Sequence, residues 1–248
     1  MSYSNENPAA RLLNIFQRVD SGTPRNATTR SVLAFVLNTD VKDTAEFHRK
    51  LAFLLQQASE INESVGQSKK RHVTKATDQI SAAMERILHN AITNENWSRT
   101  SDIIDSHFIT YLELLADHIE YVSQNNLSPE NLESVRSSID NALKSLIEAE
   151  DIPAEMRQYL SSQLHKIKRH IDDYFITGIK PAIEALEATF GHTLLNEKYR
   201  TALKEGDSTI NQVLKHLAEV AAIVSAATGI VAISSSPVAQ ALIEGSPK

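Results

Sequence analysis

The 248-residue sequence has no cysteine, and it has only seven glycines and seven prolines. Without cysteine the chain forms no disulfide, no Cys-ligated metal site and no thiol nucleophile. Glycine and proline interrupt helices, so their scarcity leaves long segments that can each form one helix. A chain of this length buries enough surface to fold without a metal or a disulfide. These absences indicate a protein that is stabilised by packing between long helices.

Positive charge and aromatic residues are also in short supply. The chain carries 25 Lys and Arg against 31 Asp and Glu, a formal net charge of −6, and only 6% of its residues are aromatic. Surfaces that bind nucleic acid combine clustered basic residues with aromatic side chains that stack on bases. The basic run Lys69-Lys70-Arg71-His72 has no aromatic neighbour, and we interpret it as a polar junction between helices. We therefore expect no nucleic acid partner.

Apolar residues recur at three- and four-residue intervals along most of the chain, the spacing that places them on one face of a helix. The clearest stripe runs through 100–124, and two more follow Pro129 and Pro153. Ser128 can cap the helix that begins at Pro129, and Gly178 can end the next one in a left-handed conformation. The pattern predicts an all-α, multi-helix bundle of about eight to ten helices with a C-terminal apolar helix. We expect the other helices at about 9–20, 27–38, 43–64, 74–94, 181–190, 195–204 and from 207 onward.

The C-terminal part contains the longest stretch without charge. Residues 220–243 carry no charged side chain and are long enough to cross a bilayer. Alanine and serine dilute their hydrophobicity, however, and no cluster of Lys or Arg flanks them. Ala221, Ser225 and Gly229 stand four residues apart and form a small-residue face on which another helix can pack closely. We expect a helical bundle domain at 1–205 and, at 206–248, an apolar helix and tail packed on the bundle or on a partner. Membrane insertion of 220–243 is the alternative.

No local motif for catalysis or cofactor binding is present in the sequence. The nine histidines show neither His-x-x-x-His nor Glu-x-x-His spacing, so we predict no metal site. Phosphate-binding glycine loops and the Gly-x-Ser-x-Gly nucleophile motif are absent too. Asp117 with His118, and Asp172 with Asp173, have groups for acid–base chemistry but are typical of solvated helix faces. We predict no cofactor and no identifiable small-molecule substrate, and favour a non-catalytic protein. An enzyme with a dispersed Asp, Glu and His site is a further alternative.

Acidic residues are concentrated in one segment. Residues 100–155 hold twelve Asp and Glu against two Lys and Arg. On a continuous 100–124 helix, five of these acids fall within a sector of about 120°, opposite the apolar stripe, at 100° per residue. We call these five residues the acidic ridge: Asp102, Asp105, Glu113, Asp117 and Glu120. The ridge can attract a basic partner or the chain's own basic stretch at 166–170.

Together these features predict a non-catalytic helical subunit or adaptor that acts through protein–protein interaction in a larger cytoplasmic assembly. We expect the acidic ridge and the small-residue face to contact a partner protein or a second copy of the chain. The first residues carry no targeting pattern of basic and apolar residues, which predicts a cytoplasmic location, including the inner face of the membrane. The alternative function is a membrane-acting effector whose C-terminal apolar segment inserts into a bilayer.

Overall fold

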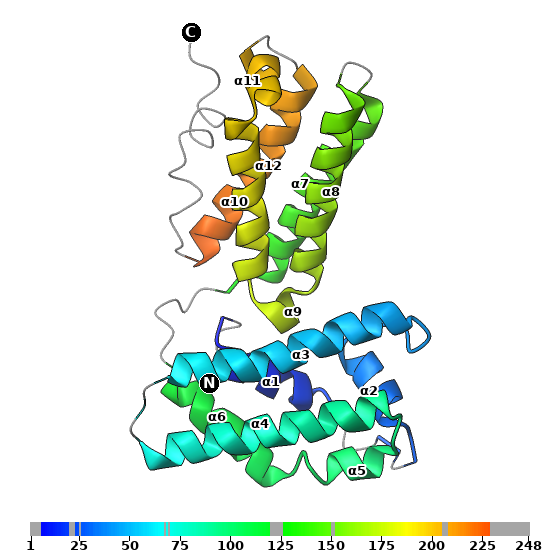
Figure 1. The fold of residues 1–248 in the computed structure, drawn as a ribbon, viewed down its shortest axis with the longest axis vertical. Helices are drawn as coiled ribbons and strands as arrows, with labels where there is room; N and C mark the ends of the chain where they lie inside the picture. Colours follow the sequence, from blue (N-terminus) through cyan, green and yellow to red (C-terminus); the bar gives the residue numbers. More distant parts are fainter. Residues whose placement is uncertain are drawn as a thin grey trace. The chain divides into compact units, whose positions relative to one another are not determined.

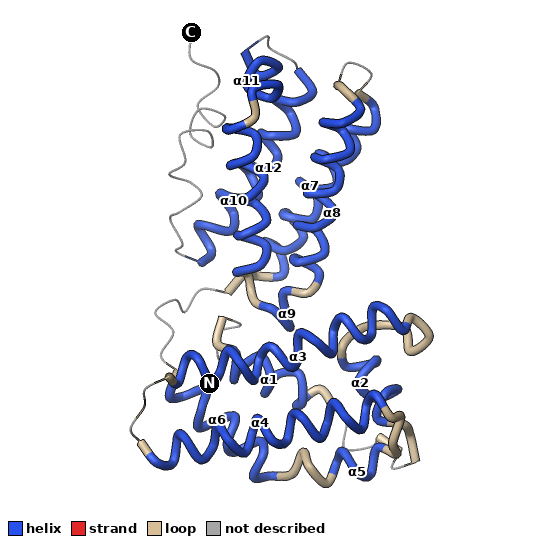
Figure 2. Tube along the Cα trace, in the orientation of Figure 1, coloured by secondary structure: helices blue, strands red, loops and turns tan. Residues whose placement is uncertain are grey.

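The computed structural model describes residues 6–19, 23–24, 26–66, 68, 70–119, 126–149, 152–204 and 208–228. Over these residues the chain is all-α, as the apolar spacing predicts, with twelve helices and no strand (Figure 1). Figure 2 shows the same trace as helices joined by loops and turns. The only extended pairing within these ranges is an isolated bridge between Thr28 and Asn96. The fold class is therefore confirmed.

The described part of the chain has more helices than the eight to ten that the sequence predicts. Two of them are very short, α5 (Trp97–Ser101) and α9 (Tyr174–Thr177). The expectation of one helix over 100–124 is wrong, because residues 102–105 are not helical and α6 begins only at Ser106 and ends at His118. Apolar residues on both sides of this break are buried, so their spacing alone does not reveal it.

The chain divides into two compact units, each with its own hydrophobic core. Unit 1 comprises residues 1–122 together with 175–178, and unit 2 comprises residues 123–174 and 179–248. α12 (Ser208–Thr228) buries its apolar residues in the same core as the other helices of unit 2. The expected division between 1–205 and 206–248 stays a prediction.

Unit 1 is built around α1 (Pro8–Gln17), in which eight of ten residues are buried. A helix that is apolar all round needs cover on all sides. α1 packs against α3 (Thr44–Val65) and α6, while α4 (Arg71–Ile92) packs on both of these helices and on α2 (Thr29–Val36). Asn7 caps α1, and its side-chain amide donates to the carbonyl oxygen of Ala116 at 2.8 Å. The start of α1 is thereby fixed to the end of α6.

Two buried cations have their hydrogen-bond partners inside unit 1. Arg11 is 3% exposed; its Nε donates to Gln57 Oε1 at 2.6 Å, and its Nη2 pairs with Glu60 Oε2 at 2.5 Å. Lys50 is also buried, and its Nζ donates to the carbonyl oxygen of Leu37 at 2.9 Å. Leu37 is the C-cap of α2. Because the last carbonyl groups of a helix lack intrahelical partners, the ammonium of Lys50 stabilises this helix end.

Unit 2 is an up-and-down bundle of α7 (Pro129–Glu148), α8 (Ala154–Asp172), α10 (Lys180–Leu195) and α12, with the short α11 (Glu197–Lys204) (Figure 1). α7 and α10 each pack against α8 and α12. The predicted start of α7 is confirmed, because Ser128 Oγ accepts a hydrogen bond from Asn131 N–H at 3.1 Å. The apolar stripe predicted after Pro153 is also buried, at Leu160, Leu164, Ile167, Ile171 and Tyr174.

The described part of the C-terminal apolar segment lies in the core of unit 2. Val220, Ala221 and Val224 on α12 are all at most 1% exposed, and α12 packs most extensively against α7. Within the described ranges, every helix is too short or too polar to span a bilayer. Residues 229–243 of the predicted apolar segment lie outside the described residues.

Candidate functional site

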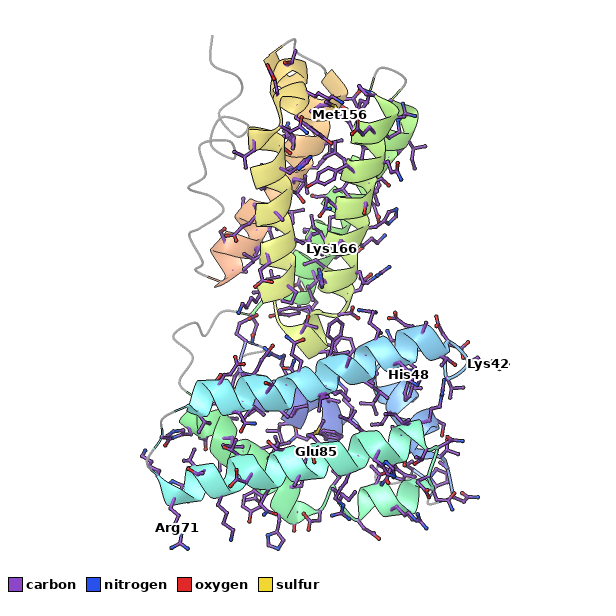
Figure 3. All side chains as sticks on the ribbon, viewed as in Figure 1. Lys42, His48, Arg71, Glu85, Met156 and Lys166 are labelled. Carbon is purple, nitrogen blue, oxygen red and sulfur yellow. The ribbon has the colours of Figure 1, made fainter. Side chains whose placement is uncertain are left out.

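The surface of unit 1 along α4, α5 and α6 is hollowed in two adjoining places. Arg86 and Asp102 line both hollows, which therefore adjoin, and we call the two together the α4–α6 groove. Glu85, on α4, belongs to its first part and is labelled in Figure 3. The first part is lined by Glu85, Arg86, His89, Asn90, Arg99 and Asp102, and the second by Gln79, Ala82, Ala83, Arg86, Asp102, Ile103, Asp105, His107, Phe108 and Tyr111.

The end of α4 forms one wall of the groove. Asn94 follows the C-cap of α4 with a left-handed backbone, φ +58°. The N–H of Glu95 donates a hydrogen bond to the carbonyl oxygen of Asn90 at 2.9 Å, and the N–H of Thr93 donates to the carbonyl oxygen of His89 at 2.9 Å. Asparagine tolerates the left-handed conformation that ends a helix in this way. His89 and Asn90 therefore line the groove from the last turn of α4.

Hydrogen bonds to residues far away in the sequence hold α5 in place. The N–H of Thr29 donates to the carbonyl of Glu95 at 2.8 Å, just before α5 begins. Inside α5, the fully buried Thr100 shares a hydrogen bond of 2.8 Å with the Thr29 hydroxyl. Trp97 on the same helix is 4% exposed. These contacts with the start of α2 hold α5 in position, and with it Arg99 and Asp102, which line the groove.

The break between α5 and α6 brings two acidic residues into the groove. Asp105 is the N-cap of α6, and its Oδ1 accepts a hydrogen bond from Phe108 N–H at 2.8 Å. A carboxylate at this position satisfies a free N–H group and stabilises the start of the helix. Asp102 is the C-cap of α5 and lies where the two hollows meet. Both aspartates are exposed.

The second part of the groove has an apolar floor and a charged rim. Ile103 and Phe108 are 9% and 3% exposed and belong to the core of unit 1. Around them Arg86, Asp105 and His107 are exposed to solvent. The surface that a partner can reach here is therefore mostly the polar and charged rim.

Charges of both signs line the groove, and all of them are accessible. Arg99 pairs with Glu95, Nη1 to Oε2, at 2.9 Å, and the arginine side chain is 68% exposed. Water and salt screen such pairs, so a ligand can replace them at little cost. Small molecules bind mainly in enclosed and mostly apolar pockets. An open groove of mixed charge is better suited to a polypeptide segment that carries charges of its own.

The structure divides the predicted acidic ridge between two surfaces. Asp102 and Asp105 line the groove, whereas Glu113 and Asp117 are exposed on α6 but do not line it. The cause is the break at 102–105, which changes the helical phase between the first two acids and the others. Glu120 lies outside the described residues. Partner binding by the ridge stays a prediction.

The small-residue face is used at least partly inside unit 2. Ala221 is 1% exposed in its core, and a partner can reach this residue only if α12 leaves the bundle. Ser225 is half-buried, and its Oγ is buried without a hydrogen-bond partner. Gly229 lies outside the described residues. Partner binding by this face also stays a prediction.

Two ion pairs of opposite direction join α7 and α8. Lys168 Nζ lies 2.5 Å from Asp140 Oδ1, and Arg136 Nε lies 2.8 Å from Asp172 Oδ1. Part of the negative charge of residues 100–155 is therefore balanced within unit 2. Asp172, an acid–base candidate in the sequence, is part of this surface network. In the part of the chain that the structure describes, no three histidine or carboxylate side chains are grouped so that they can hold a metal ion.

Three aromatic rings from α8, α10 and α11 form a cluster in unit 2. The ring centroids of Tyr159 and His192 are 4.1 Å apart, and those of His192 and Tyr199 are 5.5 Å apart. Met156, whose carbonyl lies 3.5 Å from the Tyr199 hydroxyl, is labelled in Figure 3. Burial, with smaller contributions from Tyr159 and Glu155, raises the pKa of Tyr199 to about 12. Because the rings contact one another, the cluster has a structural role.

Of the groove residues, the sequence predicts only Asp102 and Asp105 as site residues; the others, among them Arg86, His89 and Arg99, belong to no motif. Asp105 offered a signal, since an aspartate can start a helix and so divide the stretch 100–124. Comparison of the chain with protein-family models, curated proteins and solved structures found no match. The groove itself is therefore the basis on which a function can be assigned.

Proposed function

We propose that the chain is a non-catalytic helical subunit or adaptor of a larger cytoplasmic assembly, and that it binds a protein partner through the α4–α6 groove. The observation that carries this proposal is the exposed rim of both charge signs around the hollow above Ile103 and Phe108. Pairing with the rim selects the partner and sets its orientation, whereas Ile103 and Phe108 are already buried and add little contact area.

Arg86 is the central residue of this proposal because it lines both parts of the groove. It lies on α4, whose backbone is held by packing on α3 and α6. A planar guanidinium can bind a carboxylate through two parallel hydrogen bonds. We therefore expect the partner to present a segment with an Asp or Glu that pairs with Arg86.

The test is the recovery of partners by the full chain from a lysate of its native host, measured by quantitative mass spectrometry. The variant Arg86→Glu places a negative charge at the centre of the groove. It repels the expected carboxylate, and we expect recovery of the bound partners to fall by about tenfold or more. Circular dichroism checks that the helical content of the variant is unchanged.

Arg71→Glu is the matched control, with the same charge change at the other end of the same helix. Arg71 is exposed, does not line the groove and is labelled at the start of α4 in Figure 3. This variant is expected to retain the partners. A double variant, Glu113→Lys with Asp117→Lys, examines the remaining ridge residues on α6. If the double variant loses the partners and Arg86→Glu keeps them, the acidic face is the interface and the groove is not.

Fractionation of the same lysate tests the assembly. After membranes are removed by flotation, the protein is expected in a soluble peak well above 27.5 kDa, the mass of one chain. A peak at the mass of one chain contradicts the proposal. Recovery with the floated membranes, resistant to an alkaline wash, favours the membrane-acting alternative and makes residues 220–243 the segment to delete next.

A further inference from the structure

Four residues between α8 and α10 belong to unit 1, although the chain on both sides belongs to unit 2. These residues are Phe175–Gly178. Immediately before and after them, Tyr174 and Ile179 are 2% and 1% exposed in the core of unit 2. The hydroxyl of Tyr174 also accepts a hydrogen bond from Leu127 N–H at 3.2 Å. The four-residue segment is therefore anchored at both ends by residues that are buried in the core of unit 2.

Within unit 1 the segment occupies a site that fits its side chains. Ile176 is completely buried in the core of unit 1. Two cations lie over the ring of Phe175, with Arg18 Cζ 5.0 Å and Lys50 Nζ 6.0 Å from its centroid. Cations at these distances are attracted to the face of an aromatic ring. An aliphatic and an aromatic side chain are thus bound by different parts of the same site.

The last position of the segment favours glycine. Gly178 has φ +68°, the left-handed conformation that the sequence predicts. A Cβ atom at this position would lie 2.7 Å from Arg11 Nη1 and 3.0 Å from Glu6 Oε2. Arg11 is itself held by Gln57 and Glu60, so it cannot move away freely. Shape and backbone conformation both select glycine here.

We propose that unit 1 contains a binding site for a short peptide segment of the form aromatic, aliphatic, small, glycine, and that Phe175–Gly178 is its internal occupant. The segment leaves the site and returns while the rest of each hydrophobic core stays folded. A peptide of the same chemistry binds the vacated site in competition with the chain's own residues. This inference does not depend on the α4–α6 groove.

The absence of cysteine from the chain allows a direct test in the full-length protein. Ile176→Cys introduces a single thiol that a labelling reagent reaches only when the segment is out. Met84→Cys and Ile139→Cys are matched controls, since these residues are 0% exposed in the cores of unit 1 and unit 2. Local opening exposes fewer contacts than unfolding of a core, so we expect Ile176→Cys to react at least about tenfold faster than both controls. A rate equal to that of either control overturns the proposal.

Two further glycine variants test the fit of the segment. Gly178→Ala, combined with Ile176→Cys, is expected to raise the labelling rate because the added Cβ meets Arg11. Gly191→Ala is the matched control, since an added Cβ at Gly191 meets no atom within 4 Å. Equal effects of the two substitutions contradict a site that selects glycine.

A synthetic peptide with the sequence of residues 174–179 tests whether the site binds in trans. Added in excess, it is expected to speed the labelling of Ile176→Cys and to leave that of Met84→Cys unchanged. The same peptide with valine in place of its glycine is expected to have no effect. If the glycine-containing peptide leaves the Ile176→Cys rate unchanged, Phe175–Gly178 is a fixed part of the core and not the occupant of a binding site.

Discussion

The two units satisfy their buried polar groups in different ways. In unit 1 two buried cations join separate helices: Arg11 on α1 binds Gln57 on α3, and Lys50 on α3 binds the end of α2. In unit 2 the buried hydroxyl of Thr189 donates to the carbonyl of Ala185, four residues earlier in the same helix. Thr193 bonds to Thr189 in the same manner. Buried cations therefore join helices in unit 1, whereas the longer-range buried bonds of unit 2 are made by the hydroxyls of Tyr174 and Tyr199.

Arg11→Ala is expected to give the largest effect, and in unit 1 alone. It leaves Gln57 and Glu60 without their buried cation, and removal of one partner from a buried ion pair costs about 3–5 kcal/mol. Trp97, the single tryptophan, lies in unit 1, so its fluorescence during urea unfolding reports this unit. We expect a large fall in the tryptophan-detected midpoint.

The control for that change is Arg99→Ala, which also removes an ion-paired arginine. Arg99 is 68% exposed, and exposed pairs contribute about 0–1 kcal/mol. Its effect on the Trp97-detected midpoint is expected to be small. If the two variants unfold at the same urea concentration, buried polar bonds do not hold unit 1 together.

Ala221→Leu is expected to destabilise unit 2 by an intermediate amount. Ala221 is 1% exposed, and extra methylene groups in a packed core cost about 1–3 kcal/mol. We expect the transition followed by circular dichroism to shift, while the Trp97-detected transition keeps its midpoint. Ala222→Leu, at the exposed neighbouring position, is expected to leave both transitions in place. A shift of the Trp97 signal with Ala221→Leu would mean that the units do not unfold separately.

The smallest expected effect is a pH dependence confined to unit 2. The folded pKa of Tyr199 is about 12, above the ordinary value of 10, because burial disfavours the phenolate. Its contribution to stability is therefore complete below pH 10 and is lost as the pH rises from about 10 to 12. Between these pH values we expect the free energy of unfolding of the wild type to fall by about 1 kcal/mol more than that of Tyr199→Phe, measured by urea unfolding followed by circular dichroism. If the free energies of unfolding of the two proteins fall equally, the pKa of Tyr199 is not raised in the folded state.

The same contrast explains what the sequence could predict. The helices of unit 2 follow from regular stripes such as Leu160 to Ile171 and from the local cap at Ser128, which depend only on nearby residues. The start of α6 at Ser106 follows from the Asp105 cap and from α5, which Thr100 ties to Thr29, 71 residues away. No local pattern shows such a pairing. The sequence therefore does not predict the α4–α6 groove, although its charge pattern marks two of the groove residues, Asp102 and Asp105.

The discontinuity of unit 1 has a consequence for the order in which the chain folds during synthesis. The core of unit 1 is incomplete until Ile176 has been made, after the fifty-two intervening residues 123–174. At typical rates of translation this interval lasts roughly 3–10 s. During that time α1 to α6 have left the ribosome without their last core residue, while α7 and α8 are emerging. Unit 1 is therefore the first to begin folding but cannot finish before part of unit 2 exists.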